Sequence, residues 1–85
     1  MAIARISPTE VRVQCGWLDG RPRVVVMNRR RVPVLDIDGV RDEIAAYPVD
    51  RGPRRIFDVR TPESRLRLAY ERRGRRWLLE GREAA

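Results

Sequence analysis

The chain has 85 residues with a net charge of +7, because its 19 basic residues, all arginines, outnumber 12 acidic residues. This charge does not change across physiological pH, since a guanidinium group titrates far above that range. The length allows one domain, which excludes a catalytic domain joined to a separate recognition domain. The absence of histidine removes the commonest general acid–base and metal ligand.

Turn-forming residues recur about every ten residues in the first half of the chain, a spacing typical of short antiparallel strands. Thr9–Gln14 alternates polar and apolar residues, which predicts a half-buried strand before the turn at Asp19–Gly20. Arg23–Met27 is rich in valine and predicts a second strand. A third strand is expected over Val32–Ile37, ended by Asp38–Gly39.

The second half of the chain predicts one short helix and three more strands. The spacing of Val40, Ile44 and Tyr47 indicates a helix over Val40–Tyr47, with Asp38 as its N-cap. The three strands are expected at Arg55–Arg60, Arg65–Tyr70 and Arg76–Glu80. The fold class is therefore mostly β: a small antiparallel barrel or roll of five to six short strands, of SH3-like size, with one short helix. We expect residues 1–8 and 81–85 to be frayed.

The apolar phase of the strands predicts which side chains face the core. Leu66, Leu68 and Tyr70 should point inward, and Arg65, Arg67 and Ala69 outward. Cys15 continues the apolar phase of the first strand, so a buried, inert thiol is expected. Trp17 lies outside the alternation; we expect it in the core or at its rim, with an exposed contact as the alternative.

The expected location is cytoplasmic and away from membranes. One cysteine permits no internal disulfide, which is typical of proteins from a reducing compartment. The N-terminus lacks the apolar segment of a signal peptide, and the longest apolar run, Val24–Met27, is far too short to cross a bilayer.

The sequence offers few groups for catalysis, so we expect no enzyme activity and no cofactor. The chain has a cysteine thiol and serine and threonine hydroxyls, but no histidine or lysine that could activate them as nucleophiles. Acidic residues gather at Asp36, Asp38, Asp42 and Glu43. A Mg²⁺ site built from these carboxylates is an alternative, but a solvated strand face followed by a helix N-terminus is the expected interpretation.

Arginines gather at two predicted hairpin tips, Arg29–Arg31 and Arg72–Arg76, and on one outward strand face with Arg12 nearby. Guanidinium groups on exposed turns are suited to bind phosphates through paired hydrogen bonds. The predicted nucleic-acid contacts are Arg29, Arg30, Arg31, Arg65, Arg67, Arg72, Arg73, Arg75 and Arg76. Two alternatives remain open: the runs are solvated loops paired with acids, and the arginine excess reflects GC-rich coding.

Four motifs resemble a family of small basic proteins from high-GC bacteria. They are Asp19-Gly20-Arg21-Pro22, Phe57-Asp58-Val59, Leu66-Arg67-Leu68 and Gly74-Arg75-Arg76-Trp77-Leu78-Leu79. The similarity spans most of residues 9–80, whereas Asp38–Tyr47 lacks the tryptophans that members often carry there. The family has no established activity, and its members are often encoded near error-prone Y-family-type DNA polymerase genes. The resemblance implies an accessory role in mutagenic DNA repair, with a DNA polymerase complex as a partner.

The sequence thus predicts a non-enzymatic β domain that binds DNA or RNA through phosphates, or that is accessory to a DNA-handling complex. The alternative function is a protein-interaction module or homo-oligomer without a nucleic-acid role. It would use an exposed edge strand, for which Arg23–Met27 is the candidate because its valine run suits a strand apolar on both faces.

Overall fold

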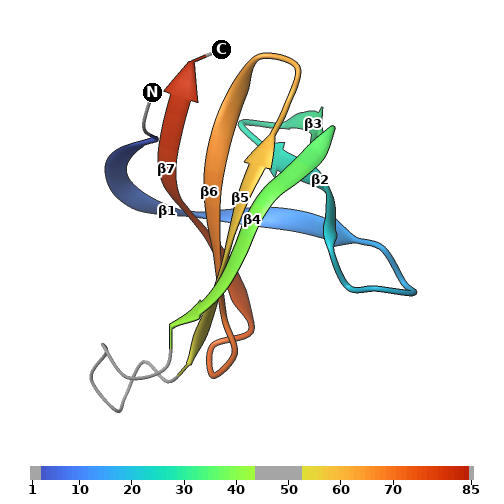
Figure 1. Cartoon of the computed structure of the whole chain (residues 1–85), viewed down its shortest axis with the longest axis vertical. Helices are drawn as coiled ribbons and strands as arrows, with labels where there is room; N and C mark the ends of the chain where they lie inside the picture. The colour runs from blue at the N-terminus through green and yellow to red at the C-terminus, as the bar shows by residue number, and fades with distance from the viewer. Residues whose placement is uncertain (1–2, 44–52, 85) are drawn as a thin grey trace.

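The computed structural model describes residues 3–43 and 53–84, and all regular elements in these ranges are strands. They are β1 (Ala4–Cys15), β2 (Pro22–Met27), β3 (Arg30–Pro33), β4 (Asp36–Glu43), β5 (Arg54–Arg60), β6 (Ser64–Glu71) and β7 (Arg76–Ala84). The strands form one seven-stranded antiparallel sheet in the order β3-β2-β1-β7-β6-β5-β4 (Figure 1). The pairing of β1 with β7 brings the two ends of the chain together.

The long strand β1 curls the sheet into a half-barrel. Its first part pairs with β7 up to Val11, and its last part, from Arg12, pairs with β2. Shifts in register within β1 let the strand bend and then cross the long strands β4–β7 (Figure 1). A mostly β, antiparallel fold is confirmed, but the sheet is curled and open, with β3 and β4 as its edges.

The core lies inside the curl, where the apolar phase of the strands meets. Leu66 and Leu68 of β6 are fully buried beside Val59 of β5, and Val25 of β2 packs against them from the other arm of the sheet. Each such side chain contributes about 1.5–3 kcal/mol relative to an exposed one. The predicted inward direction of Leu66 and Leu68 is confirmed; Tyr70 is only half-buried.

A second, smaller apolar row lies on the outer face of the same sheet. Ile56, Ala69 and Leu78 are cross-strand neighbours on β5, β6 and β7, and all three are buried. Ala69 points away from the main core, as predicted, yet it has no exposed surface. The neighbouring positions carry Arg54 and Arg67, whose aliphatic stems are suited to cover such a row.

The predicted helix over Val40–Tyr47 is wrong in the part that the structure describes. Residues up to Glu43 belong to β4, which pairs with β5 from Asp36↔Arg60 to Glu43↔Arg54, and residues 44–47 lie outside the described ranges. The register shift near Gly39 inserts Asp38 into the strand as a bulge rather than ending it. Charge pairing across β4 and β5 therefore overrides a weak helical spacing.

Other predicted boundaries also differ from the observed ones. The segment predicted as one strand, Val32–Ile37, is divided between β3 and β4. Within the segments 1–8 and 81–85, for which fraying stays a prediction, residues 4–8 belong to β1 and residues 81–84 to β7. The strands thus number seven rather than five to six. Arg23–Met27 is wrong as an edge strand, because β2 is hydrogen-bonded to β1 on one side and β3 on the other.

Candidate functional site

Every acidic side chain in residues 3–43 and 53–84 lies within ion-pair distance of an arginine. Most of these pairs join neighbouring strands. The distribution of arginines without an acidic partner therefore decides where positive charge remains on the surface.

The outward side chains of β4–β7 form what we call the ion-pair face. The Arg67 guanidinium donates two hydrogen bonds to the Asp58 carboxylate, at 2.8 and 3.2 Å, and these raise the pKa of Arg67. Arg65 donates to Asp38 at 2.9 Å and lies 3.9 Å from Glu83. Two of the predicted phosphate contacts, Arg65 and Arg67, are therefore already held by carboxylates.

The centre of the ion-pair face is a buried arginine. Arg54 has only 5% of its surface exposed, and its guanidinium donates to both carboxylate oxygens of Glu80 and to Glu43 at 3.2 Å. Glu80 is the extra residue where the β6–β7 register shifts, so the bulge delivers this carboxylate to Arg54. A buried guanidinium needs such partners, because an unpaired charge there is strongly unfavourable.

The acidic residues considered as a metal site lie apart along β4. Asp36, Asp38, Asp42 and Glu43 pair with four different arginines, namely Arg60, Arg65, Arg55 and Arg54. No three potential ligands come together within the described residues. The hydrogen bond from Arg55 holds the pKa of Asp42 below its ordinary value. These carboxylates thus serve cross-strand pairing.

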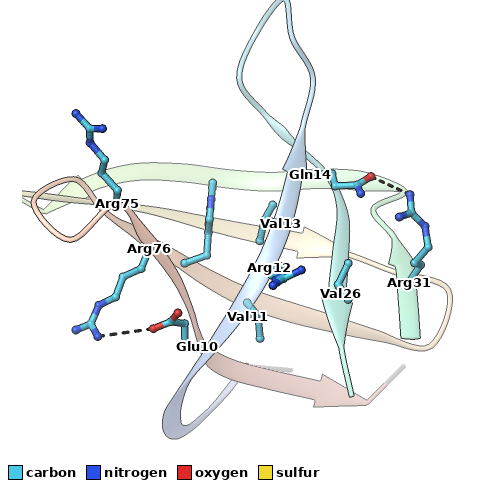
Figure 2. Close-up of a pocket in the computed structure, with 10 residues that line it drawn as sticks. Glu10, Val11, Arg12, Val13, Gln14, Val26, Arg31, Arg75 and Arg76 are labelled. Atoms are coloured by element: carbon cyan, nitrogen blue, oxygen red, sulfur yellow. Dashed lines mark hydrogen bonds and ion pairs between the residues drawn. The ribbon is translucent and has the colours of Figure 1, made fainter. Parts of the chain in front are cut away.

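A groove beside β1 gathers arginines from distant parts of the chain, and we call it the arginine groove. It has a volume of about 570 Å³ and is lined by Glu10, Val11, Arg12, Val13, Gln14, Val26, Arg31, Arg75, Arg76 and Trp77. Figure 2 shows Arg75 and Arg76 on one side, Arg31 on the other and Arg12 between them. The two arginine-rich regions therefore line one groove from opposite sides of β1.

The guanidiniums of the arginine groove have few acidic partners. Arg12 and Arg75 form no ion pair with any residue that the structure describes, and Arg31 donates to the neutral Gln14 at 2.8 Å. Arg76 is held by Glu71 at 2.6 Å, which raises the pKa of Arg76, and lies 3.9 Å from Glu10. Glu10 is the one carboxylate among the groove's lining residues.

The remaining predicted contacts do not line the groove. Arg30 turns to the opposite side of β3 and pairs with Glu63 at 3.0 Å. Arg29 is exposed in the tight β2–β3 turn, in the left-handed region at φ 65°. Arg72 and Arg73 are exposed in the β6–β7 turn. Of the nine predicted residues, Arg31, Arg75 and Arg76 thus line the groove.

Arg12 was expected near the outward strand face of Arg65 and Arg67, but Arg12 lines the groove instead. Gln14 also lines the groove and was not predicted from the sequence. The signal was present in the alternation of β1, where Arg12 and Gln14 share the polar phase. Their importance depends on which turns lie nearby, and strand spacing alone does not show that.

An aromatic hollow lies next to the groove, on the inner side of the sheet. The rings of Phe57 and Tyr70 lie 5.5 and 5.0 Å from Trp77, and Arg55 and Arg72 also line the hollow. Its volume is about 380 Å³. Trp77 lines both the hollow and the arginine groove, so the two are adjacent.

Two predictions about the end of β1 are wrong. Cys15 is exposed rather than buried, because the register of β1 against β2 shifts between Gln14 and Cys15. Although the residue is exposed, neighbouring atoms shield the Cys15 thiol partly from water, which raises its pKa, and the negative charge of Asp19 raises the pKa further. Trp17 is 91% exposed, so it belongs neither to the core nor to its rim.

No family model, curated protein or solved structure matches this chain. Within the described ranges, no helix has the length and apolar character needed to cross a membrane.

Proposed function

We propose that this chain is a non-enzymatic β domain that binds nucleic acid through phosphates held in the arginine groove. The observation that carries the proposal is the contrast in charge pairing. Acidic residues of the described chain are all paired, while Arg12, Arg31 and Arg75 of the groove have no acidic partner there.

The groove gathers like charges in a way that an anionic ligand would stabilise. Guanidiniums brought together repel one another, and a phosphate relieves this repulsion while accepting paired hydrogen bonds. Arg31 of β3 and Arg75 of the β6–β7 turn are far apart in sequence, and Arg12 of β1 lies between them. Successive phosphates of one chain fit such a row better than a single small anion does.

Phosphate contacts carry no base identity, so we expect DNA and RNA to bind with little sequence preference and with steep salt dependence. The resemblance to small basic proteins encoded near error-prone polymerase genes gives this binding a cellular setting. In that setting the domain is an accessory that helps a DNA polymerase complex to hold its template.

A titration of labelled 20-nucleotide DNA and RNA at about 50 and 200 mM salt tests the proposal. Replacing Arg12, Arg31 and Arg75 together by alanine should weaken binding at least tenfold. It should also lower the slope of log K against log salt by about 2 for single strands. The control replaces Arg30, Arg41 and Arg60, which lose the same charge from exposed ion pairs. Absence of binding at 50 mM, or equal weakening by both variants, contradicts the proposal.

Edge-strand pairing with a partner has less support as a function. The edges of the sheet are β3, which is short and contains Pro33, and β4, whose exposed residues include Asp36, Arg41 and Asp42. Proline and charge on an edge oppose pairing with another chain. We therefore expect a monomer in sedimentation experiments.

A further inference from the structure

The loop between β1 and β2 presents the most exposed large apolar side chains of the described residues. Trp17 is 91% exposed and its neighbour Leu18 is 82% exposed. Figure 1 shows this loop extending beyond the rest of the sheet. The indole is among the largest apolar side-chain groups, so leaving it in water gives up a large stabilisation from burial. Its exposure therefore indicates a contact with another molecule.

The loop is held in shape by its own hydrogen bonds. Gly16 N–H donates to the carbonyl of Arg21 at 2.9 Å, and Gly20 N–H donates to the carbonyl of Gly16 at 2.8 Å. Asp19 accepts from the Arg21 N–H at 3.0 Å and from the Arg23 guanidinium at 3.1 Å. A loop ordered in this way presents its side chains at a low cost in conformational entropy.

The exposed pair lies just beyond the end of β1, the strand that lines the arginine groove. Gln14, which accepts the hydrogen bond from Arg31, lines the groove and precedes Trp17 by three residues. Three residues span at most about 10 Å, so the backbone of Trp17 lies within that distance of Gln14, the hydrogen-bond partner of Arg31. Arg21, exposed on the same loop, adds positive charge to the loop.

We infer that Trp17 stacks on an unpaired base of the nucleic acid held in the groove, with Leu18 packing against the same nucleotide. This inference rests on the proposed function and sharpens it, because it assigns single-stranded nucleic acid as the ligand. Stacking suits an exposed indole at the end of a basic groove, because every base offers a flat apolar face to it. The positive surroundings favour a polyanion over an uncharged apolar protein surface.

The test uses the full chain, a 12-nucleotide oligothymidylate and an abasic oligonucleotide of the same length. Oligothymidylate should quench the tryptophan fluorescence of the native chain, and Trp17→Phe should lose most of this quenching while keeping near-native affinity. Trp17→Ala should weaken oligothymidylate binding at least about fivefold, since one base–aromatic stack has about that value or more. The abasic chain should bind both proteins equally. Leu35→Ala is the matched control, because Leu35 is also exposed, at 60%, but lies outside the loop.

The outcomes separate this inference from the proposed function. If oligothymidylate binds with the expected salt dependence but Trp17→Ala binds it as tightly as the native chain, stacking is overturned and phosphate binding stands. If Trp17→Ala weakens the abasic chain equally, the residue acts through the loop's structure and stacking is again overturned. If no oligonucleotide binds at 50 mM, both proposals fail. Self-association that Trp17→Ala abolishes, without quenching by oligothymidylate, would make the loop a protein contact instead.

Discussion

The ion-pair face and the arginine groove are both rich in arginine, yet they differ in what surrounds the guanidiniums. On the ion-pair face, Arg54, Arg65 and Arg67 each meet carboxylates on other strands of the sheet. In the groove, Arg12 and Arg75 meet none among the described residues. The same side chain therefore stabilises the sheet in one region and leaves charge for a ligand in the other.

This difference shows that a count of arginines does not measure a binding surface. Part of the positive charge is neutralised within the sheet, because arginines and carboxylates on adjacent strands lie close enough to form ion pairs. In the groove, Arg12 on β1, Arg31 at the start of β3 and Arg75 in the β6–β7 turn remain without an acidic partner among the described residues.

Removing the buried guanidinium should have the largest effect on stability. Arg54→Ala leaves the carboxylates of Glu43 and Glu80 without it, which should lower the free energy of unfolding by about 3–5 kcal/mol in urea titrations. Arg60→Ala breaks an exposed pair with Asp36 and should cost less than about 1 kcal/mol. Equal effects of the two substitutions would show that burial does not distinguish these pairs.

The Arg67–Asp58 pair should show a smaller but measurable coupling. Both side chains are less than one-third exposed, at 30% and 22%, and they form two hydrogen bonds. A double-mutant cycle with Arg67→Ala and Asp58→Ala should give a coupling energy of about 1 kcal/mol. A coupling near zero would mean that this pair contributes no more than a solvated one, and the ion-pair face would lose its assigned role.

Removing the groove's one carboxylate should strengthen nucleic-acid binding slightly. Glu10→Gln releases Arg76 from a partner 3.9 Å away, and we expect affinity for oligothymidylate to rise about twofold at low salt. Glu63→Gln makes the same change in net charge at Arg30, outside the groove, and should alter affinity less. Equal gains from both substitutions would indicate that net charge, rather than the groove, governs binding.

The exposed Arg55–Asp42 pair should give a small dependence of stability on acid pH. The folded pKa of Asp42 lies below its unfolded value, chiefly because of the hydrogen bond from Arg55. Its contribution is therefore present at neutral pH and is lost as pH falls below about 4, through the folded pKa. NMR titration of Arg55→Gln should show the pKa of Asp42 rising towards its ordinary value. An unchanged Asp42 pKa would refute this assignment.

The sequence was sufficient to predict the strands with a clear alternation. Leu66 and Leu68 face the core as expected, because a period of two leaves one choice once apolar residues occupy one phase. It was insufficient where charge pairing decides the outcome. Val40–Tyr47 has helical spacing, but Asp42 and Glu43 face Arg55 and Arg54 on β5, and those contacts are invisible along the chain.

The candidate site follows the same division. Two arginine-rich turns were recognisable because turn residues and charge runs are local features. Their partners were not, since Arg30 meets Glu63 and Arg65 meets Asp38 across distances of 33 and 27 residues.

The amino-acid sequence is enough to specify a permanently positive, histidine-free and mostly β domain, because side-chain chemistry and strand periodicity are properties of the residues. Which arginines keep their charge available depends on how the strands come together in the folded chain. Curling of the sheet places Arg31 and Arg75 on either side of Arg12, while strand pairing assigns Arg65 and Arg67 to carboxylates. Coulomb interactions at a few ångströms depend on folded distances, and no local sequence pattern specifies those distances.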